Sequence, residues 1–197
     1  EMYPDKAPNT VKNIIYLVQQ GFYDGLKVNL ALEDTFIEFS DGMGLATLRE
    51  TGDIPRYAIR GEFAANGFEG NDIPFERGTV AMSRYEKGDY DSAVDGFFIT
   101  LGNLPEADGN FAAFGKVVSG IEAVQEISRM KTTDASLHYE PIYSVVIEKA
   151  SVILKGITYE KPTGIVRTYY HWNSYDLWWV SDKEEATPSP VPNATPA

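Results

Sequence analysis

The sequence lacks cysteine entirely, which excludes thiol catalysis, disulfide bonds and cysteine-ligated metals. It has only two histidines, His138 and His171, and these are too isolated to indicate a catalytic pair or a set of metal ligands. We interpret both as surface or packing residues. No apolar run approaches the ~20 residues that a membrane-spanning helix requires.

Positive charge is scarce as well. The chain carries 17 Lys and Arg against 29 Asp and Glu, which gives a formal net charge of −12 at pH 7. Proteins that bind nucleic acids neutralise phosphates with Lys and Arg. The charge balance therefore argues against a nucleic-acid partner.

The residues that are abundant indicate one turn-rich domain. A hydrophobic fraction of 43% in 197 residues allows one sizeable core and leaves little room for a second full domain. Seventeen glycines, eleven prolines and 13% aromatic residues are typical of a β or α+β domain. The sequence contains no internal repeat.

The clearest helical pattern lies at residues 8–21. Asn9 or Thr10 is expected to cap its start, and Gly21 is expected to end it. Its apolar positions follow the spacing of one helix face, with Val11, Ile14, Ile15 and Val18 on that face.

A second helix is predicted at residues 119–130. Ser119 and Glu122 have the spacing of a capping box. The buried face is expected to consist of Ile121, Val124, Ile127 and Met130.

Short strand-like runs separated by Gly, Asp and Asn turns fill the space between and after these helices. They lie at residues 26–32, 36–40, 57–63, 78–85, 96–101, 111–118 and 143–154. Many strands with one helix near each end predict a mainly β fold, a closed antiparallel barrel plugged by two helices.

The composition changes after residue 154, so we divide the chain into three parts. Residues 1–154 form the predicted barrel domain, and residues 155–185 hold all three tryptophans. The aromatic side chains between Tyr169 and Trp179 either bind a partner or dock on the barrel. Residues 186–197 are rich in Pro and Thr and are expected to be an extended tail.

The order of segments over residues 1–154 resembles the cyclophilin-type peptidyl-prolyl cis-trans isomerases. The matching pieces are residues 3–26, 60–63 ("RGEF"), 77–84 ("RGTVAMSR") and 95–127. The resemblance implies an eight-stranded barrel whose N-terminal strand is incomplete here, because Glu1 falls near a strand end. It also implies isomerisation of X–Pro bonds in polypeptides without a cofactor or a metal, and "RGEF" and "RGTVAMSR" are similar to the strands that line the substrate groove.

The active-site residues implied by this resemblance are largely replaced. Where the family has Phe-His-Arg, this chain has Val28, Asn29 and Leu30, and the Gln that precedes "FFI" is Gly96. The family's Phe-Met-x-Gln corresponds here to Thr35, Phe36, Ile37 and Glu38. Its Trp-Leu-Asp-Gly turn and the following His correspond to Glu106, Ala107, Asp108, Gly109 and Phe111.

The loss of the arginine bears directly on catalysis. Rotation about an amide faces a barrier of ~18–20 kcal/mol, and the family's Arg is thought to donate toward the prolyl nitrogen. Removing one such preorganised donor commonly costs ~10²–10³ in rate. Because Leu30 donates nothing, the sequence predicts weak or lost isomerase activity.

The resemblance also indicates where a peptide pocket lies and which residues could replace the missing donor. Asn29 is one candidate, because its side-chain amide can donate, although it is shorter than arginine and neutral. Arg84 either reaches the groove or is a solvated strand-end residue. The pocket residues, which alternatively belong to the core, are Phe36, Met82, Phe98, Ala107 and Phe111, with Thr35 leaving the proline cleft wider.

Glu38 lies in an acidic segment together with Glu33, Asp34 and Asp41. Their spacing matches no recognised metal-binding loop, so no metal is predicted. We interpret these carboxylates as a solvated rim. If that rim faces the groove, it favours basic peptides.

Three functions remain open on sequence alone. The chain is a weakly active isomerase acting on proline-containing polypeptides, a non-catalytic peptide-binding module, or a cell-surface domain that binds through its aromatic segment. We expect a monomer. The Pro/Thr-rich end favours an extracytoplasmic bacterial protein whose missing N-terminus carried an export signal, with a cytoplasmic location as the alternative.

Overall fold

The computed structural model describes residues 1–40, 57–85, 88–133 and 139–166. Asp41, His138, His171, the aromatic residues 169–179 and the tail 186–197 lie outside this part. The helical elements are α1 (Pro8–Gln19), η1 (Ala64–Asn66), η2 (Pro105–Ala107) and α3 (Ile121–Ser128). The strands are β1 (Val28–Leu32), β2 (Phe36–Phe39), β3 (Tyr57–Ala58), β4 (Thr79–Met82), β5 (Phe97–Thr100), β6 (Ala113–Lys116) and β7 (Ile165–Val166).

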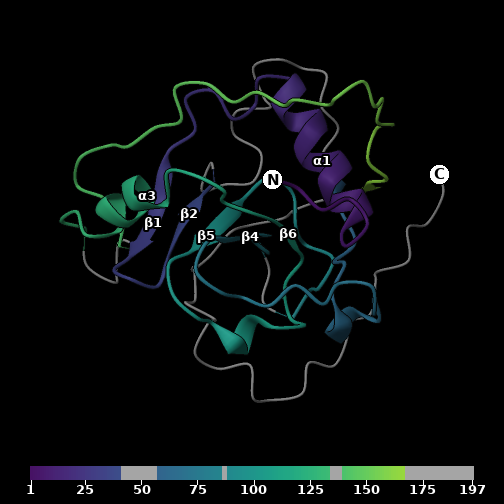
Figure 1. Ribbon diagram of the computed structural model, residues 1–197, viewed down its shortest axis with the longest axis horizontal. Coiled ribbons are helices and arrows are strands. Elements are labelled where there is room, and N and C mark those ends of the chain that lie inside the picture. The colour runs from purple at the N-terminus through teal and green to yellow at the C-terminus, as the bar shows by residue number, and fades with distance from the viewer. Residues whose placement is uncertain (41–56, 86–87, 134–138, 167–197) are drawn as a thin grey trace, which may run out of the picture.

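Five of these strands form one antiparallel sheet in the order β1-β2-β5-β4-β6, and the short strands β3 and β7 form a separate pair. Figure 1 shows the sheet in the middle of the molecule, with α3 beside β1 on the left and α1 at the upper right. The predicted antiparallel sheet with two helices is confirmed. None of the helices in the described part has the length and apolar character needed to cross a bilayer.

Short chain segments lie along both outer strands of the sheet. The Tyr3 N–H donates to the Phe114 carbonyl at 2.8 Å, and Met2 forms a bridge with Gly115 on β6. On the other side, the Val28 N–H donates to the Val145 carbonyl at 2.9 Å. Closure of the sheet into a barrel is not among the strand pairings of the residues described here.

The last predicted strand, at residues 143–154, does not form as expected. Only Val146 makes a bridge, to Lys27, and the Ile147 N–H donates to Leu26 at 2.9 Å. Further along the segment, the Ala150 N–H donates to a side chain instead of a strand, namely to the Asp24 carboxylate at 2.8 Å. The chain therefore contacts the sheet edge only briefly, at residues 145–147, in the part that the structure describes.

The predicted strand at residues 57–63 is also shorter than expected. Only Tyr57–Ala58 is a strand, followed by one bridge from Ile59 to Ala93. The "RGEF" piece that follows is not a strand, because Glu62 turns toward helix α1.

Helix α1 begins in a way that the sequence did not indicate. We expected Asn9 or Thr10 to cap it, but the N-cap residue is Ala7, which has no polar side chain. Instead, the Glu62 carboxylate accepts hydrogen bonds from the backbone N–H groups of Asn9 and Thr10 at 3.0 and 2.8 Å. The end of the helix agrees with the prediction, since Gly21 follows it with φ of +70°.

Helix α3 lacks the predicted capping box. Its N-cap residue is Gly120, with φ of +84°, so Ser119 lies one residue outside the helix. Glu122 instead occupies the first turn, where a negative charge interacts favourably with the helix dipole. Three of the predicted apolar residues pack against the core, namely Ile121, Val124 and Ile127.

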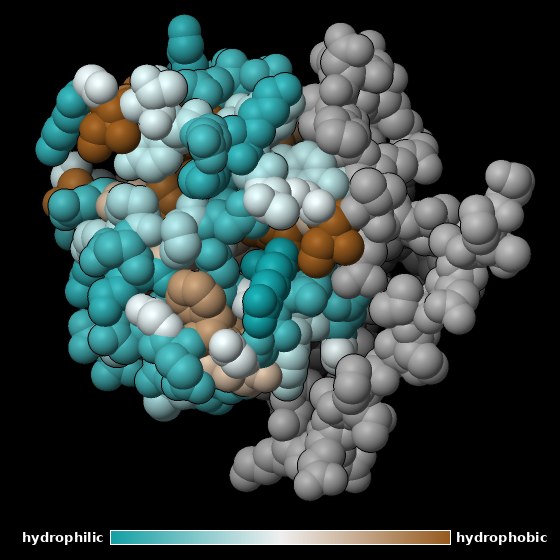
Figure 2. Space-filling model, turned by 90° about the vertical axis from the view of Figure 1, so that its right-hand side faces the viewer, coloured by the Kyte–Doolittle hydropathy of each residue, from teal (hydrophilic) through white to brown (hydrophobic). Residues whose placement is uncertain are grey.

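The core consists of two hydrophobic clusters. The larger one joins α1 to one face of the sheet and includes Val11, Ile15, Ile37 and Met82. The smaller one, which we call the aromatic cluster, consists of Leu30, Phe36, Phe75, Ala81, Phe98, Leu104, Ala107, Phe111 and Ala113. Figure 2 shows the described part of one side of the molecule as mostly hydrophilic, with hydrophobic residues in small separate spots.

The segment after residue 154 continues across the molecule to α1, as the green and yellow-green trace in Figure 1 shows. The side-chain amide of Asn9 bonds both backbone groups of Thr163, accepting from its N–H at 2.7 Å and donating to its carbonyl at 2.9 Å. Strand β7 then pairs with β3. Residues 155–166 thereby link α1 to the short two-stranded sheet.

Candidate functional site

The aromatic cluster lies on a face of the sheet where each strand contributes one residue to a single row. Leu30 of β1 is opposite Glu38 of β2, which is opposite Phe98 of β5. The row continues to Ala81 of β4 and Ala113 of β6. Because directly paired residues point to the same face, the sheet itself brings these five side chains together.

Aromatic rings surround Phe98 in this cluster. The ring centroids of Phe36 and Phe111 lie 5.7 and 5.5 Å from that of Phe98, both at steep angles. Phe75 stacks on Phe98 at 5.9 Å. The sequence prediction missed Phe75, whose only signal is an apolar side chain after Pro74 and ahead of the β4 run.

The cluster is closely filled by its own side chains. Phe36, Phe98 and Phe111 are at most 5% exposed, and Ala107 of η2 is 1% exposed. This burial fits the interpretation of these residues as core, and their role as pocket lining stays a prediction. A proline ring can reach Phe98 only if a neighbouring side chain moves.

Met82 does not join this group. It is 1% exposed and belongs to the larger cluster, on the side of the sheet that faces α1. Neighbouring strand residues point to opposite faces, so Met82 is separated from Ala81, which does contribute to the row.

Arg84 is buried beside the aromatic cluster and is not the solvated strand-end residue of the alternative interpretation. It is 5% exposed, and its guanidinium carbon lies 4.5 Å from the centre of the Phe111 ring. The rings of Tyr90 and Phe63 are 5.0 and 5.6 Å away. A guanidinium over aromatic faces is a favourable cation–π arrangement.

Glu38 is half-buried and is not part of a solvated rim. Burial raises the pKa of its carboxyl to about 7, although the neighbouring Ser83 hydroxyl acts in the opposite direction. Its partners across the sheet, Leu30 and Phe98, are apolar and offer no compensating charge. A carboxyl in such surroundings favours its neutral form.

These features coincide with a match to a known family. The model for "Cyclophilin type peptidyl-prolyl cis-trans isomerase/CLD" matches residues 1–152 of this chain. The chain belongs to this family.

Named relatives agree with the assignment. A peptidyl-prolyl cis-trans isomerase of Acinetobacter baylyi is 30% identical over 167 residues, which cover 82% of this chain and 81% of that protein. Peptidyl-prolyl cis-trans isomerase B of Bacillus subtilis is 34% identical over 128 residues, covering 65% and 80%. An Arabidopsis thaliana isomerase is 30% identical over 74% of this chain, which spans only 62% of that protein's length.

Solved cyclophilins have the same fold. A Cryptosporidium parvum cyclophilin crystallised with the dipeptide Ala-Pro superposes with a TM-score of 0.59 at 21% identity, covering 76% of this chain and 87% of that one. A cyclophilin from Hirschia baltica gives a TM-score of 0.60 at 19% identity, covering 80% and 70%. At these identities the likeness concerns the fold.

Gly96, which the sequence resemblance aligns with a glutamine of the family, lies close to two serines and a tyrosine. A Cβ atom at this position would lie 3.1 Å from Ser40 Cβ, 3.2 Å from the Tyr85 hydroxyl and 3.3 Å from Ser83 Cβ. The Tyr85 hydroxyl also donates to the buried Asp95 carboxylate at 2.8 Å. Tyr85 therefore occupies space that a longer residue at position 96 would need.

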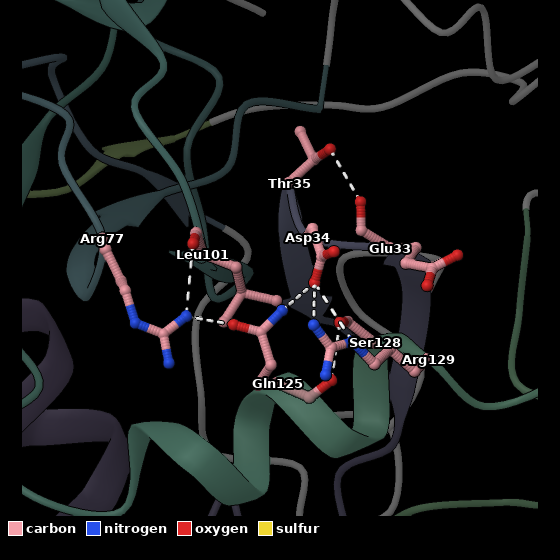
Figure 3. A network of polar contacts seen from close by, with 8 residues as sticks. All are labelled: Glu33, Asp34, Thr35, Arg77, Leu101, Gln125, Ser128 and Arg129. Carbon is pink, nitrogen blue, oxygen red and sulfur yellow. Dashed lines mark hydrogen bonds and ion pairs between the residues drawn. The ribbon is translucent and has the colours of Figure 1, made fainter.

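The β1–β2 turn next to the row is held by helix α3, as Figure 3 shows. Asp34 has a left-handed φ of +53°, and its carboxylate accepts hydrogen bonds from Arg129 at 2.9 and 3.2 Å and from Gln125. Gln125 in turn accepts a hydrogen bond from Arg77. This part of the acidic segment is thus tied to a helix.

Asn29 lies at a β-bulge in β1, where the register shifts between Val28 and Leu30. Its side-chain oxygen is buried and has no hydrogen-bond partner among the residues of the described chain. Because of the bulge, Asn29 is not paired with a residue of β2, and Leu30 is the residue that β1 contributes to the row.

Proposed function

We propose that this cyclophilin-family protein binds X–Pro segments of polypeptides at the aromatic cluster and catalyses their isomerisation only weakly. The observation that carries this proposal is the row of paired residues, in which Glu38 lies between Leu30 and Phe98. The site keeps an apolar surface for a proline ring while its β1 position lacks a hydrogen-bond donor. The Ala-Pro dipeptide used with the Cryptosporidium relative supports the same class of ligand.

Arg84 is the donor that we propose for the remaining activity. Its guanidinium lies 4.5 Å from the Phe111 ring, at the border of the aromatic cluster, and it stays charged at any physiological pH. We expect Arg84→Met to lower the exchange rate of a bound X–Pro peptide about tenfold, below the ~10²–10³ typical of a fully preorganised donor. Lys149→Met, which removes one positive charge at an exposed position outside the aromatic cluster, is the charge-matched control.

The close filling of the cluster favours a second candidate function, a non-catalytic peptide-binding module. Rings that are at most 5% exposed must move before a proline can enter, which costs affinity and preorganisation. Such a site can hold a peptide segment without aligning a donor on the prolyl nitrogen.

NMR exchange spectroscopy on a short X–Pro peptide tests these functions in one experiment. Weak catalysis predicts cis–trans exchange at least a hundredfold slower than with a cyclophilin that has the full motif. The double change Asn29→His and Leu30→Arg should then raise the rate. Binding shifts without exchange would support the non-catalytic module, and exchange at the full rate would contradict the proposed loss of the donor.

We extend the proposal to the architecture. Closure of the sheet into the family's barrel is supported by residues 1–3 and 145–147, which pair along β6 and β1. The division at residue 154, a monomeric state and an extracytoplasmic location remain proposals that follow from the sequence.

A further inference from the structure

We propose that Glu38 contacts the bound peptide as a neutral carboxylic acid, donating a hydrogen bond to a peptide carbonyl, so that peptide binding takes up one proton from solvent. This inference rests on the proposed function of the same site. It gives the site a donor on β2, where the β1 position has only leucine.

The strand register places Glu38 in the row of paired residues, on the same face of the sheet as the aromatic cluster. Its strand neighbours in the row are Leu30 on one side and Phe98 on the other. A peptide whose proline lies toward Phe98 therefore has its adjacent carbonyl groups within the neighbourhood of Glu38. The side chain is half-buried, so part of it is accessible to a ligand.

The described residues that face Glu38 from the neighbouring strands offer it no countercharge. From β1 and β5 it faces Leu30 and Phe98, and from the β4 side it faces the Ser83 hydroxyl. Of the described charged residues just after β4 and just before β5, Arg84 is held over aromatic rings and Asp95 accepts a hydrogen bond from Tyr85.

Carboxyl chemistry decides which form binds. An ionised carboxylate only accepts hydrogen bonds and repels a peptide carbonyl oxygen, whereas the protonated acid carries one O–H donor. Burial already brings the pKa of Glu38 to about 7, so both forms are populated near neutral pH. The cost of protonation is therefore small at the pH where the peptide binds.

The expected size of the effect follows from the population of the competent form. If only the protonated form binds, its share falls from about nine-tenths at pH 6 to about one-tenth at pH 8 for a pKa near 7. The dissociation constant should rise about tenfold over this range. The control Glu33→Gln, at an exposed position of the same hairpin, should show the same rise.

The test is calorimetric titration of the full chain with an acetylated and amidated Gly-Ala-Pro-Ala peptide, which has no titrating group of its own. We expect the wild type to bind the peptide about tenfold more weakly at pH 8 than at pH 6. Titrations near pH 8 in buffers of different ionisation enthalpy should show net uptake of a proton. Binding by Glu38→Gln should not depend on pH. Proton uptake is measured on the wild type, so the test survives a variant that fails to fold.

The outcomes separate this inference from the proposed function. Equal affinity at both pH values with no proton uptake would overturn the role of Glu38 and leave peptide binding intact. A pH dependence that persists in Glu38→Gln would overturn it as well. Absence of binding at both pH values would overturn the proposed function itself.

Discussion

At the scale of single residues, Glu38 links stability to pH. The ordinary pKa of a glutamate carboxyl is 4.5, and the folded value is about 7. Because the unfolded chain releases this proton first, the free energy of unfolding falls as the pH rises from about 4.5 to 7 and then levels off. The stability that the protonated Glu38 contributes is thus fully present below about pH 4.5 and is lost as the pH rises to about 7.

Replacing this carboxyl with an amide should remove that dependence. We expect Glu38→Gln to raise the free energy of unfolding at pH 8 by up to about 3 kcal/mol, because no charge then remains half-buried between Leu30 and Phe98. Urea denaturation at pH 4.5 and pH 8 measures the effect. If wild type and variant keep the same difference at both pH values, Glu38 does not titrate as described.

Residue-level roles were the hardest part of the site to predict. The sequence indicated Phe36, Phe98, Ala107 and Phe111 because they follow a known segment order, and the structure brings them together. It could not indicate Phe75, which reaches the cluster from a segment outside the strand runs. Nor could it show that Arg84 is buried and Glu38 half-buried, since burial depends on neighbours distant in sequence.

At the scale of elements, helix α1 depends on a residue some fifty positions away. The Glu62 carboxylate is buried and accepts three hydrogen bonds, from the N–H groups of Asn9 and Thr10 and from the Thr10 hydroxyl. The 3.6-residue apolar period was enough to predict the helix itself. The cap was not predictable, because no local residue supplies it.

Changing this cap tests how far α1 relies on it. Glu62→Gln keeps the size of the side chain but turns one acceptor into a donor that faces other donors. We expect a loss of about 1–3 kcal/mol in the free energy of unfolding by urea denaturation. The exposed Glu69→Gln should have no measurable effect, and equal losses for the two variants would contradict the capping role.

At the scale of the whole molecule, residues 155–166 connect parts that are distant in sequence. Asn9 holds Thr163 at one end of α1, and β7 pairs with β3. Tyr57 of β3 reaches further inward, where its hydroxyl donates to Asn13 Oδ1 at 2.6 Å. Composition alone marked a change near residue 154 but could not reveal this packing, which uses backbone groups.

Gly164 is the point at which this connection can be tested. A Cβ atom there would lie 2.8 Å from the Tyr57 side chain, closer than packed carbon atoms approach. We expect Gly164→Ala to separate β7 from β3 and to speed amide exchange at residues 57–58 and 165–166 while exchange within α1 stays slow. Thr163→Ala keeps the backbone contacts and should leave exchange unchanged.

The surroundings of Gly96 set the order in which mutations can introduce the glutamine that the sequence resemblance places there. The Cβ atom of a glutamine introduced first would lie 3.2 Å from the Tyr85 hydroxyl, which donates to Asp95, so we expect it to disturb that hydrogen bond. Shortening Tyr85 beforehand removes the collision. Tyr85 should therefore be changed before a glutamine is introduced at position 96. A library that changes one residue at a time would reject the glutamine because of the collision with Tyr85.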